Sequence, residues 1–449
     1  MHGLGRSIVL AVTISASAAG QSVRAITHVS VIDARDTAPR VDQTVLIRGH
    51  RIIASDASNT VRVPSGAQVV DGRGKYLIPG LWDMHVHTVT VSGRALLGLY
   101  VAKGVTGVRD MASVWATIVG WRGEIARGAL VGPRIVASGP YLEGGDVPIA
   151  HLLTRTPAEG RAGVDSLIAL GVDFVKVHGQ LTPPVYFAIA RRARERGIPF
   201  AGHVSRAVGS AAASDSGQRS IEHLLGIPMP CTPAESLALA PRFPVQSALG
   251  RCSSDNLAPL YARFVRNDTW VTPTFVAQVE VATWPGRGVP GDSLAHYLPK
   301  ALVKFVAEIF PMPDRVPPRA DSVGRAMLAK RMSQVAAMRV AGVHILAGTD
   351  APLRNSTPGF GLHEELLMLV RGGMSTFDAL AAATSEPARF LGLDSLGTVE
   401  TGKIADLVLL DANPLTDIRN TRRISAVVAN GRYFTGRARL ALLQRAARE

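Results

Sequence analysis

Residues 77–88 read LIPGLWDMHVHT, an apolar stretch that ends in two histidines one residue apart. The apolar part predicts a buried β-strand over 77–84. Because alternate residues of a strand point to the same side, the side chains of His85 and His87 project together. Two neutral imidazoles on one side are a natural pair of metal ligands. The stretch therefore predicts a strand with a metal site at its carboxyl end.

The middle of the chain alternates short apolar segments with amphipathic helical patterns. Strands are predicted over 77–84, 105–110, 134–138, 174–177, 199–203, 220–223, 270–274 and 344–349. Helices are predicted between them, for example over 184–196 and 322–341. Repeated strand–helix units of this number indicate an α/β protein with a (β/α)8 TIM barrel, in which the chemistry sits at the carboxyl ends of the strands.

Both ends of the chain have a different pattern, with β-branched residues, alternation and frequent turns. Strands are predicted here over 25–33, 44–47, 51–54, 67–71, 405–410 and 425–430. We expect the two ends to meet in one small β-sandwich domain. The predicted organisation is a β-sandwich over 21–76 and 393–449, with the barrel over 77–392 between them.

The first residues have the order of an export signal. Arg6 precedes an apolar stretch over 8–14, and small residues follow over 15–20. We expect residues 1–20 to be a signal peptide and the protein to be periplasmic or secreted, against the alternative of an ordinary cytoplasmic N-terminus. The two cysteines, Cys231 and Cys252, could then form one bridge or stay unpaired, since their spacing favours neither.

Composition narrows the classes of partner. The formal net charge is +14 over 449 residues, but the arginines are scattered and lack the interleaved aromatic residues of a nucleic-acid platform. Charged side chains on solvated helix faces explain this net charge better than an electropositive surface that attracts anionic substrates. No apolar run reaches the ~20 residues of a membrane span, and no Gly-x-Ser-x-Gly elbow supports a serine hydrolase. A small-molecule substrate is the expected partner, and a homo-oligomer is left open.

Four more residues that can bind metals fall at strand ends or inside a strand. Lys176 lies within the apolar strand over 174–177, where an ammonium group is costly unless it is paired or modified. His203, His223 and Asp350 close the fifth, sixth and eighth predicted strands. Each alone is better explained as a core residue or a helix cap. Their joint placement at the catalytic ends of the strands predicts one site.

This ordered set, His85/His87, Lys176, His203, His223 and Asp350, resembles the binuclear metal-dependent branch of the amidohydrolase superfamily. Four segments are similar to the imidazolonepropionase/prolidase-like (Xaa-Pro dipeptidase-like) subgroup, namely LIPG over 77–80, GTDAP over 348–352, HEEL over 363–366 and GKIADL over 402–407. The resemblance spans residues 25 to about 435.

The resemblance implies two divalent ions, with zinc the first expectation. His85, His87 and Asp350 would hold the more buried ion, and His203 and His223 the more exposed one. Lys176 would be N6-carboxylated and bridge them, which turns a buried cation into an anionic ligand. A hydroxide between the metals would attack the substrate, with Asp350 as general base.

The sequence specifies the residues that contact the substrate less closely than it specifies the metal ligands. His178 follows Lys176 by two residues and should point the same way, where relatives have small residues or Met. Tyr186 matches a tyrosine that contacts the reacting carbonyl in similar enzymes, with a core tyrosine as the alternative. His151, in the loop after the third strand, is a further candidate substrate contact. Weaker candidates are loop residues Glu143, Asp146, Arg354 and Asn355, and Asp110, which could orient a metal-bound histidine.

The expected activity is hydrolysis of an amide bond in a dipeptide, an N-acyl amino acid or a cyclic amide. A lactone or carboxylic ester is an alternative substrate, because the same groups attack either carbonyl. Lys176 argues against a mononuclear heterocycle deaminase, which generally lacks the bridging lysine. The complete ligand set argues against a non-catalytic binding protein.

Overall fold

The computed structural model describes residues 22–33, 35–89, 93–147, 150–205, 207–232, 252–253, 255–283, 297–309, 318–352 and 356–448. The predicted signal peptide and the candidates Arg354 and Asn355 lie outside these residues. No helix in the described ranges is both long and apolar enough to span a membrane.

The middle of the chain is a TIM barrel of parallel strands. Its regular strands are β6 (Leu81–Val86), β7 (Val105–Asp110), β8 (Arg134–Ala137), β11 (Val175–Val177), β12 (Phe200–Gly202), β13 (Ser220–Glu222) and β16 (Trp270–Thr272). Sequential neighbours pair in parallel from β6 to β8 and from β11 to β16. Between the two sets, the Asp173 amide donates to the Ala137 carbonyl over 3.1 Å. The fold class predicted from the sequence is confirmed.

The eighth predicted strand, 344–349, closes the barrel without forming a regular ladder. Single parallel bridges join Ile345 to Val271 and Ala351 to Val86. The amide of Leu346 donates to the Val271 carbonyl, and the amide of Met84 donates to the Ala347 carbonyl, both over 2.9 Å. The segment thus lies between β16 and β6, which places Asp350 beside His85.

The first predicted strand, 77–84, is two strands. Its first half belongs to β5 (Tyr76–Pro79), which pairs with β17 (Leu407–Leu410) of the β-domain, and its second half belongs to β6 of the barrel. The sequence predicted one strand because both halves are apolar. The prediction was wrong, because the two halves pair in different sheets.

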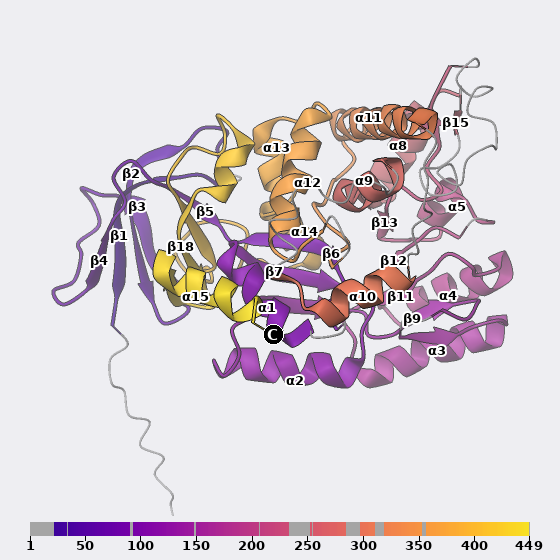
Figure 1. The fold of residues 1–449 in the computed structure, drawn as a ribbon, viewed down its shortest axis with the longest axis horizontal. Coiled ribbons are helices and arrows are strands. Elements are labelled where there is room, and N and C mark those ends of the chain that lie inside the picture. The colour runs from indigo at the N-terminus through magenta and orange to yellow at the C-terminus, as the bar shows by residue number, and fades with distance from the viewer. Residues whose placement is uncertain are drawn as a thin grey trace, which may run out of the picture.

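Both chain ends share one eight-stranded sheet in the order β19-β18-β17-β5-β1-β2-β3, with β4 paired to β1. In Figure 1 the indigo N-terminal strands and yellow β18 lie together beside the barrel. The boundaries at 76/77 and 392/393 stay predictions. The remaining strands of this sheet are β1 (Arg24–Val31), β2 (Arg40–Arg48), β3 (Arg51–Ala57), β4 (Gln68–Asp71), β18 (Ile424–Ala429) and β19 (Arg432–Thr435).

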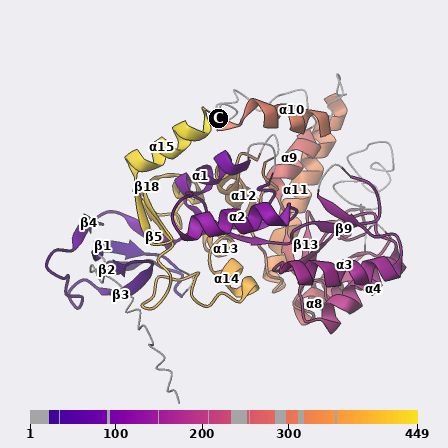
Figure 2. The ribbon, with the colours of Figure 1, turned by 90° about the horizontal axis from the view of Figure 1, so that it is seen from below.

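Helices cover the outside of the barrel; α2, α3 and α4 follow one another along one flank (Figures 1 and 2). Apolar residues recur at helical spacing along α4, which buries that face against the strands. The described helices are α1 (Gly93–Ala102), α2 (Trp115–Ala126), α3 (Pro157–Leu170), α4 (Pro183–Glu195), α5 (Ser210–Asp215), α8 (Ala258–Arg266), α9 (Phe275–Thr283), α10 (Lys300–Ile309), α11 (Pro318–Val340), α12 (Phe360–Arg371), α13 (Thr376–Ala381), α14 (Ser385–Leu391), α15 (Gly436–Ala446) and the 3-10 helix η2 (Ile418–Arg422).

Two excursions leave the carboxyl side of the barrel. Strands β9 (Tyr141–Glu143) and β10 (His151–Leu153) follow β8, and β9 pairs with β11. Strands β14 (Met229–Pro230) and β15 (Cys252–Ser253) pair in the excursion after β13. Cys231 is disulfide-bonded, which agrees with the first of the two alternatives for the cysteines.

Candidate metal centre

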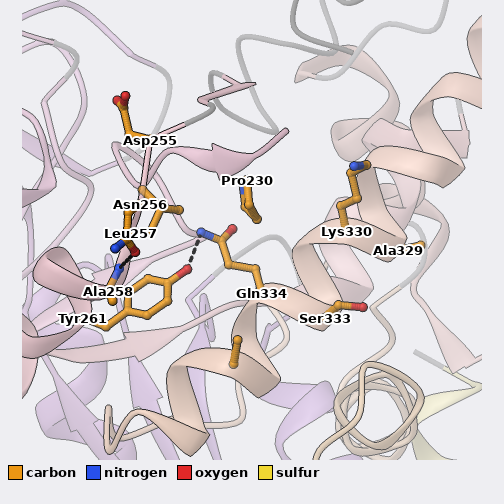
Figure 3. Close-up of a pocket in the computed structure, with 11 residues that line it drawn as sticks. Pro230, Asp255, Asn256, Leu257, Ala258, Tyr261, Ala329, Lys330, Ser333 and Gln334 are labelled. Carbon is orange, nitrogen blue, oxygen red and sulfur yellow. Dashed lines mark hydrogen bonds between the residues drawn. The ribbon is translucent and has the colours of Figure 1, made fainter. Parts of the chain in front are cut away.

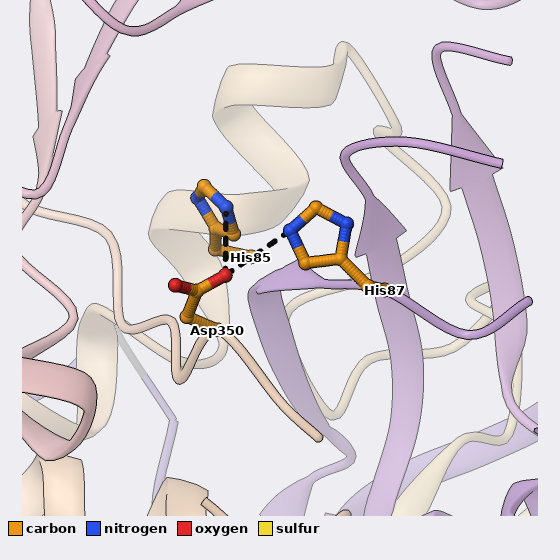
Figure 4. Close-up of side chains that lie close together, drawn as sticks. All are labelled: His85, His87 and Asp350. Atoms are coloured by element: carbon orange, nitrogen blue, oxygen red, sulfur yellow. Dashed lines mark ion pairs between the residues drawn. The ribbon is translucent and has the colours of Figure 1, made fainter. Parts of the chain in front are cut away.

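Three predicted ligands meet at the carboxyl end of the barrel. His85 is the last residue but one of β6, His87 lies just beyond the strand, and Asp350 follows the closing segment. One oxygen of Asp350, Oδ1, lies 3.3 Å from Nε2 of His85 and 3.1 Å from Nε2 of His87 (Figure 4). One ligand atom from each residue lies within 4.8 Å of the others. The sequence-predicted corner of the site is therefore assembled.

The electrostatics of this corner fit a cation. Nδ1 of His85 faces a carboxylate oxygen of Glu222 over 2.8 Å, so Nδ1 carries a hydrogen and, in the neutral ring, Nε2 carries the lone pair. Nε2 is buried, has no hydrogen-bond partner, and faces the carboxylate of Asp350. Two acceptors at this distance repel unless a positive charge lies between them. Tetrahedral zinc ligands at about 2.0–2.1 Å from the ion are separated by roughly 3.3 Å, which agrees with the observed spacing.

His203 and His223 complete the row of histidines. The ring centroids of His85 and His223 are 4.5 Å apart, and those of His223 and His203 are 4.8 Å apart. Nε2 of His223 lies 4.0 Å from Oδ2 of Asp350, so the carboxylate faces both groups of histidines. Burial lowers the pKa of His203 well below its usual range and that of His223 to about 3. Both imidazoles are therefore neutral, the form that binds metals.

Lys176 projects from β11 and is 1% exposed. Burial lowers its pKa to about 8, against the opposing influence of the nearby Glu222 and Asp350 carboxylates. A Cβ at Gly202 would lie 2.8 Å from Cδ of Lys176, so glycine before His203 leaves room for the lysine side chain. The structure thus brings all six predicted ligands to one end of the barrel.

The backbone at the site is held in uncommon conformations. His223, Thr274 and Asp350 have φ values of 58°, 52° and 59°, in the left-handed region. The hydroxyl of Thr274 donates to the Pro273 carbonyl and lies 2.6 Å from Nδ1 of His223, so it accepts from that nitrogen. His223, like His85, consequently directs the lone pair of Nε2 to the site. Strain of about 1–3 kcal/mol per residue is typical of functional sites.

The sequence reasoning missed the group that orients His85. Glu222 is fully buried, and both its oxygens accept from Nη2 of Arg109 over 2.9 Å. Burial alone would raise the pKa of Glu222, but Arg109 and His85 hold it well below its usual range. The available signal was the carboxylate in the sixth strand, which reads SIEH. Its partners could not be predicted, because they lie 113 and 137 positions away.

Asp110 was one of the weaker candidates, as a residue that could orient a metal-bound histidine, and the structure gives it other partners. Oδ2 of Asp110 accepts from the amide of Thr88 over 2.6 Å, and Oδ1 accepts from the amide of Ala112 over 3.1 Å. Asp110 therefore fixes the loops that follow the first two barrel strands and contacts no histidine.

Tyr186 does not join the site, in contrast to the prediction of a catalytic and substrate contact. Its ring packs against Phe200, and its hydroxyl donates to the side-chain oxygen of Gln218 over 2.5 Å. It lies on the buried face of α4, and its partners, Phe200 and Gln218, are not among the predicted ligands. The alternative, a core tyrosine, is what the structure shows.

His178 does reach the site, as its spacing from Lys176 predicted. Its ring centroid lies 4.1 Å from that of His203 and 4.7 Å from that of Tyr141. His151 lies farther out, with its ring 6.0 Å from Tyr141. Asp146 pairs over 3.5 Å with Arg155 in an exposed loop, as expected for a solvated residue.

A groove of about 710 Å³ lies between α8 and α11 on the flank of the barrel (Figure 3). Tyr261 and Gln334 meet across it through a 3.2 Å hydrogen bond. None of the six predicted ligands lines this groove. It is therefore separate from the metal centre.

Known proteins resemble the chain in sequence and in fold. The family model described as Amidohydrolase family matches residues 269–433. An uncharacterized protein of Mycobacterium tuberculosis is 31% identical over 161 residues, which cover 33% of this chain and 41% of that protein. A protein of Mycobacterium bovis matches equally. The chain thus matches less than half the length of these relatives.

Solved structures match over most of the chain. A bottromycin amidohydrolase superposes with a TM-score of 0.75 at 23% identity, covering 95% of this chain and 90% of that chain. A Xaa-Pro dipeptidase with bound methionine in its active site superposes with a TM-score of 0.67 at 22% identity, covering 92% and 100%. Similarity at these identities establishes the fold. Residues 269–433 therefore resemble the amidohydrolase family, and the chain shares the fold of solved amidohydrolases.

Proposed function

We propose that this protein is a metal-dependent hydrolase that cleaves an amide bond in a dipeptide, an N-acyl amino acid or a cyclic amide. One observation carries the metal dependence: the lone pair of His85 Nε2 faces the Asp350 carboxylate over 3.3 Å, with no hydrogen-bond partner. The family match and the amidohydrolase and dipeptidase folds support amide substrates. The prolidase-like subgroup is proposed on the same basis.

The donor set fits two divalent ions, with zinc as the expected metal. His85, His87 and Asp350 would hold one ion, and His203 and His223 the other. When bound, the two ions would supply Lewis acidity and lower the pKa of water towards ~7. The proximity of Asp350 to both groups of histidines, through Oδ1 and Oδ2 respectively, supports a shared site.

Lys176 is proposed to be N6-carboxylated and to connect the two ion positions of the site. The neutral Nζ would attack the carbon of carbon dioxide and release one proton to water, which leaves an anionic carbamate with two oxygen atoms that can bind metal. Burial lowers the pKa of Lys176 to about 8, so a larger share of the amine is neutral at physiological pH than in an exposed lysine. The added negative charge would offset the charge of two cations.

Asp350 is proposed to transfer the proton of the attacking water. Its carboxylate lies between the two groups of histidines, 3.1 Å from Nε2 of His87 and 4.0 Å from Nε2 of His223. It would take a proton from the attacking water and deliver it to the leaving nitrogen. The neutral histidines cannot compete as bases while they bind metal.

Metal analysis and a hydrolysis screen test this function. About two zinc ions per chain are expected after purification and dialysis against zinc. The zinc-loaded enzyme should hydrolyse at least one member of a panel of dipeptides, N-acyl amino acids and cyclic amides. Turnover of lactones or esters alone would contradict amide hydrolysis, and full activity after removal of all metal would contradict the metal dependence.

Export is a separate proposal, based on the basic, apolar and small residues over 1–20. Fractionation of cells that express the full chain tests it. The protein should appear in the periplasm or medium, shortened at its N-terminus. An uncleaved protein in the cytoplasm would contradict export.

A further inference from the structure

A histidine–carboxylate pair borders the metal centre on the side of His203. His178 lies just beyond β11, and Glu143 ends β9 of the excursion after the third barrel strand. The ring of His178 packs on that of His203, with centroids 4.1 Å apart at an interplanar angle of 33°. Neither His178 nor Glu143 belongs to the six-residue ligand set.

Glu143 fixes the orientation of the His178 ring. Its side chain is fully buried, and Oε1 accepts from the amides of Gly144 over 2.6 Å and Gln180 over 3.0 Å. Its other oxygen, Oε2, pairs with Nδ1 of His178. Because the Glu143 carboxylate only accepts, Nδ1 carries the hydrogen and, in the neutral ring, Nε2 carries the lone pair.

This arrangement repeats the one seen at two predicted ligands. His85 has Nδ1 held by Glu222, and His223 has Nδ1 held by Thr274, so both turn Nε2 to the site. The side chain of His178 differs in being 27% exposed, whereas that of His85 is fully buried. No residue in the described ranges forms a hydrogen bond with Nε2 of His178. Part of the His178 side chain is therefore open to a bound molecule.

We propose that His178 contacts the substrate and that Glu143 is its positioning residue, with Nε2 accepting a hydrogen bond from the N–H of the scissile amide. The inference rests on the proposed amide hydrolysis and narrows its substrate class to secondary amides, which excludes an Xaa-Pro bond although the fold resembles that of a Xaa-Pro dipeptidase. A tertiary amide or an ester has no such N–H and would leave the acceptor unpaired. An unpaired buried acceptor disfavours the bound state.

Matched substrates test the contact. Each amide cleaved in the screen is compared with its N-methyl analogue, in the zinc-loaded wild type and in His178→Ala. We expect the wild type to favour the N–H substrate by kcat/KM roughly 10–100-fold, and His178→Ala to lose most of this preference. Zinc content should stay at the wild-type value, because His178 is outside the ligand set.

Glu143→Gln tests the positioning role. Because two backbone amides donate to Oε1, the oxygen of the new side chain stays at that place and its NH2 group faces Nδ1. This NH2 donates to Nδ1, so the hydrogen of the ring moves to Nε2, which can no longer accept. We expect the same loss of N–H preference as in His178→Ala, and no additional loss in the double variant. Glu386→Gln is a matched control, because Glu386 lies 2.8 Å from Nδ1 of His344 at the start of the barrel-closing segment. It should leave the preference unchanged.

The outcomes separate the two proposals. If the wild type cleaves no amide, the proposed function fails. If it cleaves amides but handles N–H and N-methyl substrates equally, or favours a tertiary amide such as an Xaa-Pro bond, only the inference about His178 fails. Loss of zinc from His178→Ala would also overturn it, since His178 would then be a metal ligand.

Discussion

Nδ1 of His85 lies 2.8 Å from Oε2 of Glu222, while Nε2 of the same ring faces Oδ1 of Asp350 over 3.3 Å. Glu222 is held in turn by Arg109, and neither side chain is exposed to solvent. One buried carboxylate therefore sets both the tautomer and the direction of a predicted ligand. A carboxylate that accepts a hydrogen bond from the other ring nitrogen raises the basicity of a metal-bound histidine.

Glu222→Gln should weaken zinc binding at the His85 corner by roughly 10–100-fold, because the amide is a weaker acceptor for Nδ1. Competition with a chromogenic chelator measures this affinity. Arg109 also loses its charge partner, so the free energy of unfolding should fall, by about 3–5 kcal/mol if the guanidinium stays unpaired. Resistance to the chelator equal to that of the wild type would contradict the orienting role of Glu222.

Lys176→Ala should lose at least one of the two metal ions and most of the activity, since the proposed carbamate is the ligand that both ions share. Elemental analysis of the dialysed variant gives the ratio of metal to protein. Reconstitution of metal-free wild type should be more complete with added bicarbonate than in degassed buffer. Full metal loading with unchanged turnover in Lys176→Ala would exclude a carbamate bridge.

Gly348→Ala should displace His85. A Cβ at Gly348 would lie 2.6 Å from Cγ2 of Thr272 and 2.9 Å from both the amide nitrogen and Cβ of His85. We expect the free energy of unfolding to fall by about 1–3 kcal/mol, as in other overpacked cores, and zinc binding to weaken.

A second glycine provides the control for this variant. A Cβ at Gly120 of α2 would meet nothing within 4 Å. Gly120→Ala should therefore raise the free energy of unfolding by about 0.5–1 kcal/mol, through helix propensity. Equal effects of the two substitutions on unfolding and on zinc binding would refute the steric argument.

Acid should destabilise the fold through His363. Burial lowers its pKa to about 3, while Nδ1 contacts Thr421 and Nε2 contacts the carbonyl of Lys103. Above pH 6.5 the ring is neutral in both the folded and unfolded chains. Below that pH the unfolded chain binds a proton that the folded chain does not, so stability falls until the pH approaches 3.

Urea unfolding at several pH values tests this contribution. His363 alone should remove up to about 1.4 kcal/mol per pH unit below pH 6. The difference in unfolding free energy between wild type and His363→Gln should therefore narrow as the pH falls from 7 to 5. A difference that stays constant over this range would show that His363 titrates alike in both states.

Local sequence patterns were sufficient to predict the barrel and the positions of the predicted ligands along the chain. Apolar segments marked the strands, and the direction of each ligand followed from its distance to the strand end. His178 was placed correctly by the same alternation from Lys176. Tyr186 was placed wrongly because a resemblance located its position in the chain, whereas its direction depends on which face of α4 packs on the strands.

The sequence by itself determined the fold class, the β-rich ends and the six residues that gather at the barrel mouth. These follow from periodicity, which is a property of neighbouring residues. Only the tertiary structure decided that residues 77–84 divide between two sheets, that Glu222 rather than Asp110 orients His85, and that Glu143 holds His178. Each depends on partners far away in the chain, and periodicity carries no information about which distant groups meet. The His-x-His pair can be recognised within twelve residues, but Glu222, the carboxylate that orients His85, is brought to it only by the folding of the barrel.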